Sequence, residues 1–214
     1  AVVRARAAEL AVAVHAAPRS VSLPETNLEG AHQRLNAAVA LRICELAAPR
    51  LPFDPASARA ALREVRWEAR WQRVALADGR TLIIDASHNE EGARSLEPLL
   101  AGLRRPTIIV GATGTGRAKP LLEVVARHAC ALHLVEPASE RATKVDELAA
   151  MLPPFAGPVQ RSRVAELFPL KGACVAAGET VVVVGSLYLA GEVLGRLRGE
   201  APSVDWQDRL LPAR

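Results

Sequence analysis

The second half of this 214-residue chain repeats one pattern four times, a short β-branched run followed by an amphipathic helix. The four runs are TLIID, TIIVG, ALHLVE and TVVVVG, which begin at Thr81, Thr107, Ala131 and Thr180. Runs this apolar are typical of parallel strands that helices cover on both faces. Crossovers between such strands are right-handed, so the pattern predicts an α/β, Rossmann-like, mostly parallel sheet. Asp78–Gly79, between two β-type runs, predicts a hairpin just before it.

The first part of the chain is helical in character. Residues 1–14 are rich in Ala and Val, and residues 31–48 carry apolar side chains at steps of three and four, namely Leu35, Val39, Ile43 and Leu46. Three prolines within PRLPFDP (49–55) predict a linker. We therefore expect two domains, a helical one at 1–50 and the sheet domain at 51–214.

Composition excludes several classes of protein. No apolar run approaches the ~18–20 residues of a membrane span, and the arginines within AVVRARAAEL are foreign to a secretory signal, so we expect a cytoplasmic protein. Arginines and acids alternate along the chain, with a net charge of +4 and only 3% aromatic residues, which disfavours nucleic-acid binding. Three distant cysteines without a CxxC pair predict neither a metal site nor a disulfide framework.

The strand ends carry the candidate site, because ligands of such folds bind at the carboxyl ends of parallel strands. The sharpest segment is DASHN (85–89), in which the Asp85 carboxylate can accept hydrogen bonds from ribose hydroxyls and His88 lies at the crevice mouth. The alternative is that Asp85 and Ser87 only cap the following helix.

Two further segments are open to more than one interpretation. GATGTGR (111–117) matches neither GxGxxG nor GxxxxGK[ST], so a tight strand-to-helix turn is favoured over a phosphate loop. His32, Gln33 and Asn36 lie on adjacent positions of one helical face, which indicates a ligand contact, a domain contact or a solvated first turn capped by Asn27.

Four segments together resemble one family. GAHQRLNAAVAL (30–41), WEARWQ (67–72), DASHNEEGARSL (85–96) and GSLYLAGEVL (185–194) are similar, in order and spacing, to motifs of folylpolyglutamate and dihydrofolate synthases. This family belongs to the Mur-ligase superfamily of ATP-dependent amide-bond ligases. The resemblance implies that residues 1–50 are a helical remnant of the central ATPase domain and that 51–214 form the C-terminal ligase domain.

The resemblance also implies which residues bind the nucleotide. Asn36 would contact the adenine, Arg70 the ATP phosphates and Asp85 the ribose, with His32 and Gln33 beside Asn36. The P-loop and the Mg²⁺ ligands of the family lie in an N-terminal half that this sequence does not match, so the chain alone is expected to be inactive.

The same resemblance implies the reaction. The family activates a folate or dihydropteroate carboxylate as an acyl phosphate, which the amine of L-glutamate then attacks. His88, Ser186 and Tyr188 would lie near the glutamate and the acyl phosphate. Family members are commonly monomers.

The sequence departs from the family pattern at three places. Glu68–Ala69 replaces Pro-Gly, Gln72 replaces Glu, and GTGRAK (114–119) stands where many members have Asp-Lys-Asp. Two alternatives therefore stay open: a Mur-type ligase for another amino-acid acceptor, and a non-enzymatic, degenerate nucleotide-binding module. Gln33 favours the folate branch, since the muramyl branch is expected to have Asn at this position.

Overall fold

The computed structural model describes residues 2–17, 23–51 and 54–200. The chain forms two compact units, a helical unit at Ala1–Trp67 and a sheet unit at Glu68–Arg214. The division lies later than the boundary expected at residue 50. Asn27 Nδ2 donates to the Val65 carbonyl at 2.9 Å and Arg63 pairs with Glu25 at 2.7 Å, so the segment that precedes the sheet is joined to residues of the helical unit.

The described part of the helical unit contains three helices: α1 at Val2–Glu9, α2 at Ala31–Ala47 and α3 at Pro55–Ala61. The helix expected at 31–48 is confirmed, whereas the first helix is shorter than the expected 1–14. Asp54 caps α3, since its carboxylate accepts from the amides of Ala56 and Ser57 and a proline occupies the first helical position.

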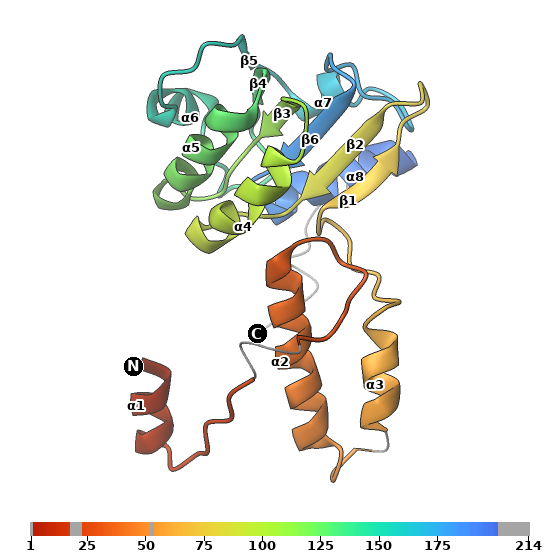
Figure 1. The fold of residues 1–214 in the computed structure, drawn as a ribbon. Coiled ribbons are helices and arrows are strands. Elements are labelled where there is room, and N and C mark those ends of the chain that lie inside the picture. Colours follow the sequence, from red (N-terminus) through yellow and green to blue (C-terminus); the bar gives the residue numbers. More distant parts are fainter. Residues whose placement is uncertain (1, 18–22, 52–53, 201–214) are drawn as a thin grey trace, which may run out of the picture. The chain divides into compact units, whose positions relative to one another are not determined.

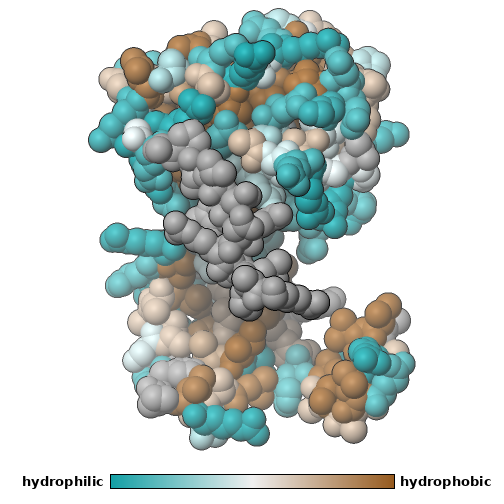
Figure 2. Space-filling model, turned by 180° about the vertical axis from the view of Figure 1, so that it is seen from behind, coloured by the Kyte–Doolittle hydropathy of each residue, from teal (hydrophilic) through white to brown (hydrophobic). Residues whose placement is uncertain are grey.

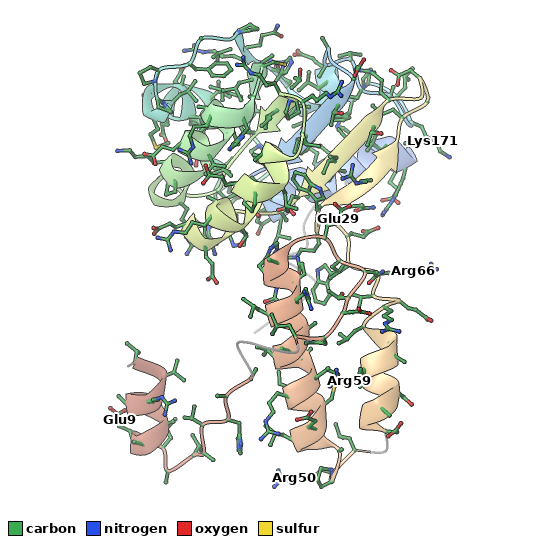
Figure 3. The ribbon with its side chains drawn as sticks, viewed as in Figure 1. Glu9, Glu29, Arg50, Arg59, Arg66 and Lys171 are labelled. Atoms are coloured by element: carbon green, nitrogen blue, oxygen red, sulfur yellow. The ribbon has the colours of Figure 1, made fainter. Side chains whose placement is uncertain are left out.

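The buried face of α2 is not the apolar series that predicted the helix. The buried residues are Gln33, Ala37, Ala38 and Leu41. Leu35, Val39, Ile43 and Leu46 are between 40% and 61% exposed, and hydrophobic patches are visible on this unit in Figure 2. Charged side chains such as Arg50 and Arg59 are also exposed (Figure 3).

A six-stranded sheet organises the sheet unit, which confirms the predicted α/β class. The strands are β1 (Gln72–Ala75), β2 (Thr81–Asp85), β3 (Thr107–Val110), β4 (Ala131–Leu134), β5 (Val159–Arg161) and β6 (Thr180–Val184). Their order is β1-β2-β6-β3-β4-β5. β1 pairs antiparallel with β2 through the predicted hairpin, and the other pairs are parallel.

Helices cover both faces of this sheet, as predicted (Figure 1). On one face α4 (Glu90–Ala101), α5 (Ala118–His128) and α6 (Val145–Met151) share a core with Ile83, Ile108 and Val182. On the other, α7 (Val164–Leu167) and α8 (Leu187–Arg198) share a core with Ile84, Ile109 and Val183. Alternate residues of each strand thus enter opposite cores, as the pleat requires. None of the described helices is long and apolar enough to cross a membrane.

Acidic and basic side chains alternate over the surface of the sheet unit. Arg127 pairs with Glu97, Lys144 with Glu136, and Arg161 with Asp146, at 2.7 to 2.9 Å. Such exposed pairs contribute little to stability, because water screens them. These ion pairs agree with the alternation of acidic and basic residues along the sequence.

The position of β6 sets where a ligand can bind. β6 lies between β2 and β3, and it leads into α8 on one face while its two neighbours lead into α4 and α5 on the other. A crevice forms at such a switch point, outside the carboxyl ends of the strands.

Candidate functional site

The exits of β2, β6 and β3 lie side by side at the switch point. Val184 at the end of β6 is level with Asp85 on one side and with Val110 on the other. The next residues of β6 and β3 approach closely, since a Cβ on Gly185 would lie 2.4 Å from the Gly111 carbonyl oxygen. Gly185 also has a φ of 116°, which only glycine adopts readily. The exits of β3 and β6 therefore lie backbone against backbone.

Asp85 is buried at the end of β2 and is hydrogen-bonded through both oxygens. Oδ2 accepts from the Trp71 amide at 2.8 Å, and Oδ1 accepts from the Ser87 amide at 2.9 Å and the Ser87 hydroxyl at 2.5 Å. The carboxylate does not cap α4. That position belongs to Asn89, whose Oδ1 accepts from the Gly92 amide at 2.7 Å.

His88 is held in one orientation by the loop. Its Nδ1 lies 2.9 Å from the Ala86 carbonyl oxygen and the ring is half-buried. Since a carbonyl only accepts, Nδ1 carries the proton, and in the neutral ring Nε2 is then the acceptor. The imidazole is thereby prepared to accept a hydrogen bond or a proton at Nε2.

Arg70 occupies an unusual turn just before β1. Its neighbours Ala69 and Trp71 have φ values of 55° and 52°. Two hydrogen bonds hold the turn: the Ala69 amide donates to Gln72 Oε1, and the Ala69 carbonyl accepts from the Ala86 amide, both at 2.9 Å. Within the described part of the chain, the Arg70 guanidinium has no hydrogen bond or ion pair, and the residue is partly exposed. A guanidinium fork in this state is available for an anion.

The two tryptophans around Arg70 differ in environment. Trp71 is buried in the core of the sheet unit, whereas Trp67 is 64% exposed. Of the two, only Trp71 therefore anchors the Arg70 turn in the core.

Ser186 and Tyr188 lie at the start of α8. Ser186 is buried, and its Oγ accepts from the Tyr188 amide at 3.1 Å as the N-cap. The Tyr188 side chain is exposed. Ser186 has a structural role as the cap, and its hydroxyl proton remains available to donate.

The helical unit carries His32, Gln33 and Asn36. Asn36 Nδ2 donates to Gln33 Oε1 at 3.1 Å, and Gln33 is buried. His32 is half-buried on the first turn of α2. Gly30 is the N-cap of this helix, so the capping by Asn27 that sequence considerations left open is not observed.

The glycine-rich segment after β3 is a tight turn. Gly114 has a φ of 81° and donates its amide to the Arg141 carbonyl at 3.1 Å, and Thr113 forms a bridge with Ala142. A single 3₁₀ turn at Thr115–Arg117 then leads into α5. The favoured interpretation, a strand-to-helix turn, agrees with this geometry.

No cluster of three or more His, Cys, Asp or Glu side chains that could hold a metal ion occurs in the described ranges. A shallow pocket of about 440 Å³ lies at the opposite edge of the sheet, lined by 102–107 and 178–180. These residues lie at the amino ends of β3 and β6, away from the exit loops.

Comparison with known proteins gives fold matches only. No protein-family model matches the sequence, and no curated protein sequence matches it. Among solved structures, folylpolyglutamate synthase from Mycobacterium tuberculosis, in complex with ADP, is 25% identical with a TM-score of 0.63 over 83% of this chain and 42% of that one. The Thermotoga maritima synthase is 24% identical, with a TM-score of 0.60 over 80% and 40%. The bifunctional folylpolyglutamate synthase/dihydrofolate synthase from Yersinia pestis is 21% identical, with a TM-score of 0.59 over 83% and 41%.

The fold is that of the folylpolyglutamate synthases. This chain spans about two fifths of the length of the synthases it matches. The structural likeness and the four motifs, found independently, indicate the same family of folds.

Two residues of the Arg70 turn differ from the synthase motif, and the structure shows how each of them preserves the turn. Ala69 stands where the synthase motif has glycine, and its φ of 55° is one that glycine adopts freely. Gln72 stands where the motif has glutamate, and its Oε1 accepts from the Ala69 amide as a carboxylate oxygen can. Both substitutions keep the turn around Arg70. The bond between Asp85 and the Trp71 amide has no signal in the sequence, because the two residues are fourteen positions apart and one partner is backbone.

Proposed function

We propose that this chain is the C-terminal part of an ATP-dependent ligase that joins L-glutamate to a folate or dihydropteroate carboxylate through an acyl phosphate. The observation that carries the proposal is the match of fold and motifs together: the synthase-like segments at 67–72, 85–96 and 185–194 meet at one switch point. That location is where ligands bind in open α/β sheets.

Arg70 is the proposed phosphate-binding residue of this chain. Its guanidinium is unpaired among the described residues, and a planar fork suits two phosphate oxygens at once. Charge that develops on a transferring phosphoryl group is stabilised by such pre-placed cations. The neighbours' complexes with ADP and with AMPPCP are consistent with a nucleotide ligand.

His88 and Tyr188 are the proposed contacts of the amino-acid substrate. His88 Nε2 can accept a proton from the ammonium of glutamate, so that the resulting amine attacks the acyl phosphate, and the exposed Tyr188 hydroxyl can hydrogen-bond a carboxylate. Ser186 keeps α8 capped beside them. Asn36, with Gln33 and His32 beside it, is proposed to bind the adenine. The resemblance implies that Asp85 binds the ribose, and both carboxylate oxygens of Asp85 are also hydrogen-bonded inside the protein.

Magnesium accompanies ATP in this class of reaction, and the described residues do not fit a site for it, because they contain no cluster of metal-binding side chains. We therefore assign no step of the reaction to a metal held by this chain.

The test is incorporation of labelled glutamate into dihydropteroate or a folate by the complete gene product, with ATP. We expect incorporation that requires both ATP and the pterin substrate, and a His88→Ala variant slowed by about 10²–10⁴-fold, as for loss of a general base. The 214-residue chain alone should give none. Glutamate transfer that proceeds equally without a pterin, or onto a different acceptor, would reject the folate assignment.

A further inference from the structure

Ser87 connects the buried carboxylate of Asp85 to the loop that follows β2. The Ser87 hydroxyl donates to Asp85 Oδ1 at 2.5 Å, and the Ser87 amide donates to the same oxygen at 2.9 Å. Together these two bonds fix the orientation of the serine side chain. Asp85 is only 4% exposed, whereas Ser87 is half-buried. The serine hydroxyl is therefore the part of this pair that a ligand reaches more readily.

The Ser87 hydroxyl can only accept a further hydrogen bond. A serine hydroxyl has one proton and two lone pairs, and an ionised carboxylate only accepts, so the proton lies toward Asp85. Within the described part of the chain, no group donates to Ser87 Oγ. The carboxylate behind it polarises the hydroxyl, which strengthens a hydrogen bond that the lone pairs accept. Ser87 thus offers a position for a hydrogen-bond donor of a ligand.

The first turn of α4 passes close to Ser87 without covering it. A Cβ at Gly92 would lie 3.1 Å from Ser87 Cβ and 3.2 Å from Ser87 Cα. Because position 92 is glycine, no side chain at this position crowds the serine, and Ser87 stays half-buried. The close approach and the hydrogen bonds to Asp85 hold the hydroxyl in place before any ligand binds, which lowers the entropic cost of binding.

The charges around this hydroxyl favour a cationic donor. Asp85 has a buried carboxylate, and in the described ranges no lysine, arginine or histidine side chain pairs with it. Glu90 and Glu91 follow in the first turn of α4, and of these two only Glu90 has an ionic partner, Arg94, among the described residues. A buried charge is stabilised by an opposite charge beside it. An ammonium group is positive and only donates hydrogen bonds, so it matches both properties of this position.

We propose that Ser87 Oγ binds the ammonium group of the amino-acid substrate, with the Asp85 carboxylate behind it. His88 is the next residue, and its Nε2 is likewise an acceptor in the neutral ring. Ser87 thus binds the ammonium next to the residue that accepts its proton. The proposal rests on the proposed function for the presence of an amino-acid substrate, and it applies to any α-amino acid.

The first experiment compares L-glutamate with glutarate, which has both carboxylates of glutamate and no amine. In the complete gene product, Ser87→Ala should raise the KM for L-glutamate about tenfold, as for loss of a hydrogen bond to a charged group. Inhibition by glutarate and the KM for ATP should stay unchanged. The matched control is Ser139→Ala, at a half-buried serine in the loop after β4, whose Oγ accepts from the Arg141 amide. It should alter none of the three values.

Three results would overturn the proposal. Equal weakening of glutamate and glutarate would mean that Ser87 only supports the loop. A higher KM for ATP with an unchanged KM for glutamate would place Ser87 at the ribose, and unchanged values throughout would remove any role in binding. If Ser87→Ala does not fold, Ser87→Cys replaces it, since a thiol is a weak acceptor of similar shape. The same selective loss is then expected.

The second experiment separates this proposal from the ligase reaction. In the ¹⁵N-labelled 214-residue chain, L-glutamate should shift the amide resonances of Ser87 and His88, whereas glutarate should not. Ser87→Ala should remove the difference between the two compounds. A gene product that joins glutamate to no pterin and still gives these shifts would reject the folate assignment and support the role of Ser87. The absence of any shift that depends on the amine would overturn the role of Ser87, whatever the ligase assay gives.

Discussion

Arg70 is a candidate site residue that amino-acid composition alone does not reveal. The sequence predicted its role from a motif, and the structure adds that it lies between two left-handed residues with its guanidinium unpaired among the described side chains. Asp85 shows the opposite case. Its place at a strand end was predictable, whereas its bond to the Trp71 amide was not, because that bond depends on how β1 and β2 pair.

Replacement of Arg70 should weaken ATP binding. Arg70→Ala removes a charged hydrogen-bond donor, so we expect a loss of about 1.5–3 kcal/mol in binding free energy. Arg70→Lys should recover only part of it, because an ammonium cannot make a forked contact. Calorimetric titration of the complete gene product measures both, with Arg161→Ala, an exposed arginine on β5, as the control. Unchanged affinity in Arg70→Ala would show that the residue is only part of the turn.

A buried histidine makes stability depend on pH. Burial lowers the pKa of His133, whose Nδ1 lies 2.8 Å from the Ser162 hydroxyl on the neighbouring segment. The unfolded chain therefore binds a proton more readily than the folded one. Stability should be constant above the ordinary histidine pKa of about 6.5 and should fall as the pH drops below it.

Denaturant unfolding between pH 7.5 and pH 5 tests this dependence. His133→Gln should flatten the part of the acid loss that comes from this residue, whereas His15→Gln, at an exposed position, should leave the profile as it is. An unaltered profile in His133→Gln would mean that other groups cause the acid loss.

The elements that the sequence predicted are those with strong periodicity. The four strand-and-helix units and the hairpin at Asp78–Gly79 are all confirmed. β5 was not predicted, because its three residues, Val159, Gln160 and Arg161, are all exposed and lack an apolar pattern. The order of the strands could not be predicted from the sequence either. The insertion of β6 between β2 and β3 depends on pairing between segments about 70 to 100 residues apart.

The exits of β3 and β6 should tolerate no side chain at Gly185. In Gly185→Ala the new Cβ would lie 2.4 Å from the Gly111 carbonyl oxygen, at a φ of 116°. We expect a loss of at least about 2 kcal/mol in the free energy of unfolding, from strain and from separation of the two loops. The matched control is Gly191→Ala within α8, where a Cβ meets no atom within 4 Å. It should stabilise the helix by about 0.5–1 kcal/mol.

Denaturant unfolding of the two glycine variants and of the unmodified chain measures these changes in the free energy of unfolding. Equal stability of Gly185→Ala and the unmodified chain would mean that the close approach of the two exits is not needed for the fold.

At the scale of the whole chain, the sequence explains the packing of the sheet unit better than that of the helical unit. The sheet unit buries its strands on both faces with its own helices. In the helical unit the apolar series of α2 predicted the helix correctly but is exposed among the described residues. The solved synthases are about twice as long as this chain, and the activity proposed here concerns the complete ligase.

The central claim is that the Arg70 turn, beside the exit loops of β2 and β6, binds the phosphates of a nucleotide. A titration of the ¹⁵N-labelled chain with ATP, followed by amide chemical shifts, tests it most directly. The account predicts that the shifts change first at Arg70, Trp71, His88 and 185–188, and that Arg70→Ala removes these changes. Changes confined to the opposite edge of the sheet, at 102–107 and 178–180, or no changes at any ATP concentration, would contradict it.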